Sequence, residues 1–332
     1  MHISRLALAA LLAFGCAASI RAEEAEWTVL LEPMYMDAYG HDTHVLTIRD
    51  SNLDSTPTQI EETPVALDTK DGIGFRFELQ YARSDWGLGL DFFWFNTTQG
   101  RPTRTDAASP PAGAEQVAFE TADRTFTSDD PGEILFFNVL EDTELTTWTV
   151  DLYGLKTLTE TPAASLQLQF GLRNADFDND FHSAAGIENV GGTLVDASSN
   201  YGRMLGPLVG LVTDVHFGKH SIRAYLGQSV VLGTAELLLH ETSDFVGPFS
   251  TTPTITARES FNKDENVAIP ITEFRINWLY PISQRIAVGV SANASVWWNV
   301  PVPPGVIPGA SDTFHEDTLV YFGLAVAVKL KI

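Results

Sequence analysis

Cysteine is almost absent from this chain, positive charge is scarce, and no apolar run beyond the N-terminal segment is long enough for a membrane helix. The single cysteine, Cys16, lies in that segment, so an exported chain without it has no disulfide, thiol nucleophile or cysteine metal site. Gly15-Cys16 also leaves lipidation open, although Ala13 and Phe14 fit a lipoprotein acceptor site poorly. A formal charge of −23 excludes nucleic-acid binding through a basic surface.

The first 22 residues have the three parts of a secretory signal peptide. The positively charged start ends at Arg5, an alanine- and leucine-rich run covers 6–18, and Ala22 precedes two acidic residues. The run is too short and wrongly flanked for a membrane span. We therefore expect 1–22 to be cleaved and 23–332 to form one domain.

The apolar residues of the remaining chain alternate with polar ones, most clearly over 72–97. Successive side chains of a strand point to opposite sides, so this hairpin has one apolar, aromatic-tipped face and one polar, glycine-rich face. Each strand is about twice the usual ~5–6 residues and close to the roughly 9–11 that cross a bilayer. The expected lipid-facing residues include Phe75, Phe77, Leu88 and Leu90, and Arg76, Glu78 and Asp91 face the lumen.

Ten such strands are expected, joined alternately by tight and by long connections. This layout is typical of an all-β, closed, antiparallel, up-and-down transmembrane β-barrel with periplasmic turns and extracellular loops. The tight turns include Ser84-Asp85 and Gly218-Lys219, and one long connection covers 178–202. The strands are expected at 27–36, 72–83, 86–97, 145–157, 165–177, 203–217, 220–239, 267–281, 285–299 and 317–332.

Some segments of the long connections could add strands to the ten. Residues 45–49 and 64–67 could pair within the first long loop, as an extension of the barrel wall or as an extracellular hairpin. The apolar island 134–139 could fold into the mouth, extend a strand or add a further pair. Twelve strands therefore remain an alternative to ten.

Residue types indicate which face is outside, since a lipocalin would alternate in the same way with its apolar face inward. Charged residues in mid-strand beside glycine suit a wet lumen, and two aromatic levels suit the interfacial girdles of a membrane barrel. The expected pore-lining residues are Arg76, Glu78, Asp91, Asp151, Arg173, Asp214, Arg223, Glu273, Arg275 and Lys329. The expected aromatic girdle is Trp27, Trp86, Trp94, Trp148, Tyr280 and Trp298.

The chain ends in a strand, 317–332, with apolar residues at alternate positions and an upstream glycine. This ending resembles the C-terminal signal that outer-membrane barrels present to the insertion machinery. It departs from that signal in ending on Ile332 where phenylalanine or tryptophan is usual.

A wider resemblance covers mainly 145–332. It rests on the segments 148–155 and 170–173, on Tyr201-Gly202-Arg203-Met204-Leu205-Gly206-Pro207-Leu208-Val209-Gly210, and on 224–229 after the tight turn. Together they resemble the major-outer-membrane-protein-like, pore-forming barrel family of Gram-negative bacteria. The resemblance implies passive diffusion of small solutes and carries no catalytic residues.

These observations predict a porin-like outer-membrane barrel, cation-leaning because of its acidic loops, in contact with lipid and lipopolysaccharide. No enzyme activity or cofactor is expected. No metal site is expected either, because the acidic runs have no complete calcium-loop spacing. The alternative is a non-conducting structural or adhesive barrel that works through its long loops. An outer-membrane protease or a lipid-modifying enzyme is a remote alternative. Asp214 and His216 suggest the protease, although they adjoin a tight turn and not the extracellular mouth.

Overall fold

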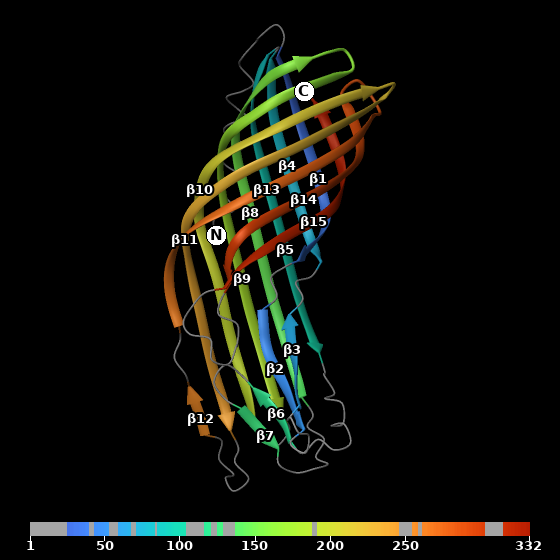
Figure 1. The fold of residues 1–332 in the computed structure, drawn as a ribbon. Helices are drawn as coiled ribbons and strands as arrows, with labels where there is room; N and C mark the ends of the chain where they lie inside the picture. The colour runs from blue at the N-terminus through green and yellow to red at the C-terminus, as the bar shows by residue number, and fades with distance from the viewer. Residues whose placement is uncertain are drawn as a thin grey trace.

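Ten antiparallel strands close into a barrel in this computed structural model, which describes residues 25–39, 43–52, 59–67, 71–83, 85–103, 116–120, 125–128, 137–187, 191–245, 254–257, 261–302 and 315–332 (Figure 1). The wall strands are β1 (Ala25–Tyr39), β4 (Gly72–Arg83), β5 (Trp86–Thr103), β8 (Phe137–Glu160), β9 (Ala164–Ile187), β10 (Gly191–Phe217), β11 (His220–Phe245), β13 (Phe261–Pro281), β14 (Ile286–Val302) and β15 (His315–Lys331).

Each wall strand pairs with its neighbours in the chain, and β1 closes the ring by pairing with β15. The end of β15 is fixed to the start of β1, because the Ile332 backbone N–H donates to the Trp27 carbonyl at 3.0 Å. The predicted all-β, ten-stranded antiparallel barrel is therefore confirmed. The predicted signal peptide and Cys16 lie outside the described residues.

One predicted loop is strand instead. The segment 178–202 was expected to be a long connection, but β9 continues to Ile187 and β10 begins at Gly191, with these two residues paired. Beyond the bilayer a barrel wall has no lipid to face, so its strands need no apolar alternation, and this sequence signal is lost although the ladder continues.

A second, four-stranded sheet lies toward the end of the molecule opposite the C-terminus (Figure 1). It consists of β2 (Thr43–Asn52), β3 (Gln59–Leu67), β6 (Gln116–Glu120) and β7 (Thr125–Ser128), in the order β3-β2-β6-β7. Strands β2 and β3 form the hairpin predicted at 45–49 and 64–67, outside the barrel wall. Strand β12 (Thr254–Ala257) pairs with the end of β11, and the second half of the apolar island 134–139 begins β8.

The outer face of the wall carries the large apolar side chains. The exposed ones include Leu152, Phe170, Leu226 and Leu324, and the residues that alternate with them along each strand point inward. This arrangement exposes a continuous apolar belt, as a barrel surrounded by lipid requires. Among the described residues no helix is long and apolar enough to cross a membrane.

Tight turns join the strands at one end of the barrel. Gly218 has a φ of +61°, the left-handed conformation that glycine adopts without steric cost, and it begins the two-residue link from β10 to β11. These turns mark the periplasmic rim, and the long connections mark the extracellular end.

The apolar belt can be tested by moving a charge along one strand. Leu152→Arg places a cation on the lipid face in the middle of β8, and we expect it to lower the free energy of unfolding by about 2–4 kcal/mol. Leu158→Arg, on the same face at the rim, is the control and should cost about 0–1 kcal/mol. Urea unfolding in liposomes measures both, and equal losses would contradict the proposed depth.

Candidate functional site: the barrel interior

The interior at the level of the membrane is filled by charged side chains that bond to one another. We call Glu78, Asp91, Asp151, Glu273, Arg76, Arg173, Arg223 and Arg275 the ion network. All are buried except Arg223, which is partly buried. They come from six strands, β4, β5, β8, β9, β11 and β13.

Arg173 is the best-connected member of the ion network. Its Nε and one terminal nitrogen bond both oxygens of Asp151 at 2.8 and 2.6 Å, the bidentate geometry that suits a guanidinium and a carboxylate. The same terminal nitrogen bonds Glu273 at 2.5 Å, and Glu273 also lies 3.5 Å from Arg76. These contacts join β8, β9, β13 and β4 through the lumen.

Two further pairs span the full width of the barrel. Arg223 on β11 donates to Glu78 on β4 at 3.1 Å, and Arg275 on β13 donates to Asp91 on β5 at 2.8 Å. In the ring order, β11 lies opposite β4 and β13 lies opposite β5. A pair of side chains therefore suffices to close the lumen.

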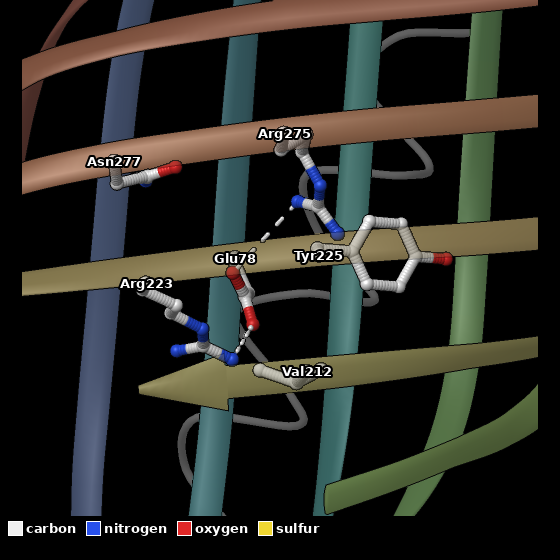
Figure 2. Close-up of a pocket in the computed structure, with 6 residues that line it drawn as sticks. All are labelled: Glu78, Val212, Arg223, Tyr225, Arg275 and Asn277. Carbon is white, nitrogen blue, oxygen red and sulfur yellow. Dashed lines mark hydrogen bonds and ion pairs between the residues drawn. The ribbon is translucent and has the colours of Figure 1, made fainter. Parts of the chain in front are cut away.

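Figure 2 shows the periplasmic side of this network. Glu78 lies between Arg223 and Arg275, and the Arg275 guanidinium lies over the Tyr225 ring, 4.2 Å from its centroid. With Val212 and Asn277 these residues line a cavity of about 10 Å³, enough for one water molecule and no more.

The two tyrosines beside the network explain why glycine lines this wall. A Cβ at Gly89 would lie 2.2 Å from the Tyr153 ring, and one at Gly227 would lie 2.0 Å from the Tyr225 hydroxyl. Tyr153 in turn donates to Glu78 at 2.6 Å. Both glycines are therefore covered by rings and do not border an open path.

Above the ion network, toward the extracellular end, the interior is mainly apolar, with Thr147 and Asn179 buried among the apolar side chains. Five buried aromatic side chains form a chain of ring contacts across the lumen, which we call the aromatic layer: Phe95, Tyr321, Trp297, Phe177 and Tyr201. Their successive centroids are 5.3, 6.1, 6.3 and 5.1 Å apart. Such contacts are typical of a packed core. The sequence predicted a wet lumen, and at this level the described lumen is closed by mainly apolar packing.

The residues predicted to line a pore all point inward. Eight of the ten belong to the ion network, and the other two, Asp214 and Lys329, lie nearer the short-turn end and are less buried. Of the predicted girdle, Trp27 packs on Tyr81 at the periplasmic rim, with ring centroids 4.9 Å apart. Trp94 and Trp148 are paired neighbours at the other level, and Trp86, Tyr280 and Trp298 are exposed.

Three polar interior residues were not among the predicted pore-lining residues. Glu32 is fully buried on β1 and accepts a hydrogen bond from Asn277 on β13, and Asn293 on β14 accepts one from Arg76 of the ion network. Leu30, Glu32 and Met34 are every second residue of β1 and share its inward face. The position of Glu32 in the strand could therefore have identified it as an interior residue.

The Asp214 and His216 pair lies at the periplasmic end, as expected. His216 is exposed two residues before the tight turn, and its backbone N–H donates to the Ala163 carbonyl at 2.7 Å. Within the described residues, no three His, Cys, Asp or Glu side chains are grouped so as to hold a metal ion.

Outside the membrane, β9 carries acidic residues on its outer face. Burial, followed by the negative charges of Asp180, Asp176 and Glu144, raises the pKa of Asp178 from 3.8 to about 6. Burial also raises the pKa of Asp176 and of Asp180. We call Asp176, Asp178, Asp180 and Glu144 the acidic wall. It begins at the level of Trp148, the paired neighbour of Asp176 on β8, and continues toward the extracellular end.

No protein-family model matches the chain, and no curated protein matches it. Among solved structures the chain is similar to the outer-membrane protease OmpT from Escherichia coli, with a TM-score of 0.50 and 11% identity over 95% of this chain and 99% of that chain. The fold is that of an outer-membrane β-barrel. Identity this low describes the fold and not the activity.

Two other similar structures score lower. They are Ail, the attachment invasion locus protein of Yersinia pestis (TM-score 0.27, 10% identity, 92% of this chain and 99% of that chain), and the CymD monoaromatic hydrocarbon channel (TM-score 0.31, 9% identity, 94% and 89%). The resemblance to one pore-forming family stays a prediction.

The ion network can be tested at Glu273, which two arginines share. Glu273→Gln leaves a buried guanidinium short of its countercharge, and we expect the free energy of unfolding to fall by about 3–5 kcal/mol. Glu26→Gln, which breaks the exposed pair with Lys331, is the control and should cost less than about 1 kcal/mol. Equal effects in urea unfolding would show that the network is not a buried one.

The acidic wall predicts a pH dependence. Because the pKa of Asp178 is raised in the folded state, its ionisation opposes folding, and that penalty appears as pH rises from about 4 to about 6. Asp178→Asn should therefore reduce the stability loss in this window, measured as the urea midpoint against pH. Thr146→Val, at the paired position on β8, is the control that keeps the acid. An unchanged pH profile in Asp178→Asn would contradict the assignment.

Proposed function

We propose that this protein is a closed outer-membrane barrel that does not conduct solutes and works through its extracellular end. The observation that supports this proposal is the filled interior. The ion network and the aromatic layer lie one above the other, and the largest buried side chains, including Trp297, Arg173 and Tyr321, are at most 2% exposed. A ten-stranded barrel lies near the size at which side chains alone fill the lumen.

The length of the strands supports an extracellular role. Strands β8 to β11 have 24, 24, 27 and 26 residues, more than twice the roughly 9–11 that span a bilayer. They run toward the end where the small sheet of β2, β3, β6 and β7 lies (Figure 1). Much of the length of strands β8 to β11 therefore lies outside the membrane. A barrel that works through its extracellular end requires such a structure.

Passive diffusion of small cations, the first expectation from the sequence, would require both layers to move aside. The cavity beside Glu78 has room for about one water molecule, so the porin-like interpretation has less support than the closed barrel. The proposal includes no catalytic role, because Asp214 and His216 lie at the periplasmic rim. Its partners would be outer-membrane lipid and lipopolysaccharide around the belt, and the insertion machinery through β15.

Conductance across a planar bilayer tests the closed barrel. We expect the purified, refolded protein to give no stepwise currents at any voltage, while a general porin in the same membrane conducts. Heat-modifiable gel migration and protease protection must first show that the protein is folded and inserted. Stepwise currents that favour cations would overturn the proposal and restore the porin-like function.

A further inference from the structure

The described residues of the interior carry one more negative than positive charge. At the level of the ion network, five carboxylates (Glu32 and the four of the network) face four guanidinium groups. Asp214 and Lys329, nearer the periplasmic rim, add one charge of each sign and leave this difference unchanged. An unbalanced charge in a water-poor interior is costly, so the fold needs one further positive charge here.

Glu32 is the carboxylate that lacks a cationic partner. Its side chain is fully buried, and its Oε1 accepts one hydrogen bond from Asn277 Nδ2 at 2.8 Å. In the described part of the chain, its Oε2 has no hydrogen-bond partner. Arg76 is the paired residue on β4, but its guanidinium contacts Asn293, Glu273 and Asp91 instead.

Glu32 has oxygen-bearing side chains on one side and apolar ones on the other. To reach Asn277 on β13, the side chain crosses β15 and β14, where the inward residues are the small Ala327 and Ser291. Ser291 Oγ lies 3.5 Å from Asn277 Oδ1. A carboxylate, an amide and a hydroxyl oxygen therefore gather beside Ala327, on which the buried Leu30 and Leu279 also pack.

We propose that the barrel interior binds one monovalent metal cation, sodium or potassium, at the free oxygen of Glu32, with Asn277 and Ser291 as neutral oxygen donors. One such ion balances the interior charge, whereas a divalent ion would reverse the imbalance. Hard cations bind oxygen donors of these three kinds. The site is independent of conduction, because it lies within a packed lumen.

Thermal unfolding of the full-length protein in detergent tests the site. The midpoint is measured in sodium, potassium and N-methylglucamine chlorides at one ionic strength. We expect sodium or potassium to raise the midpoint saturably, by roughly 5–10 °C at about one hundred times Kd, because a ligand bound only to the folded state stabilises it. Glu32→Gln removes the charge and should melt at one temperature in all three salts. The exposed Glu26→Gln should respond as the wild type does.

A second readout does not depend on the stability of the variant. Sodium NMR relaxation should be enhanced by the wild-type protein, and potassium should reverse the enhancement if it competes for the site. Identical wild-type midpoints in all three salts would overturn the proposal. So would a cation response that survives in Glu32→Gln, or a stability that follows pH alone, which would mean that a proton balances the interior.

Discussion

The lumen is narrow enough for an arginine on one wall to reach a carboxylate on the opposite wall, as Arg223 reaches Glu78 and Arg275 reaches Asp91. Buried ion pairs of this kind add little net stability compared with well-packed apolar residues. Their larger effect here concerns register. A slip of one residue in a strand would turn its lumen charges toward lipid, where each cation costs about 2–4 kcal/mol at the midplane. The network thus favours one arrangement of the ring over its neighbours.

The same narrowness determines the other interior residues. Where an arginine and a carboxylate meet across the lumen, the adjoining wall has room only for glycine beneath Tyr153 and Tyr225. Where no charges are placed, the lumen must still be filled, and the aromatic layer fills it with rings from β5, β9, β10, β14 and β15. Closure is therefore a property of the whole cross-section and does not depend on one plug or one loop.

Alternation made most of this wall predictable. The strand at 72–83 has the predicted bounds, and the inward direction of Arg76 and Glu78 follows from the opposite direction of Phe75 and Phe77. The partners of these charges could not be predicted, because they lie on strands far away in the ring, and their height depends on the stagger of every strand between them. The aromatic layer was missed because 92–95 is apolar on both faces, so Phe93 and Phe95 gave no contrast with Phe92 and Trp94.

The distribution of charge finally limits where the protein can act. The formal charge is −23, and the described interior is nearly balanced, so these interior residues do not account for the excess negative charge. On the described outer wall, the pKa of Asp178 is raised by burial and by the negative charges of Asp180, Asp176 and Glu144. Acidic side chains in this state favour contact with water and counterions. The described outer wall around Asp178 is therefore an acidic, solvated surface.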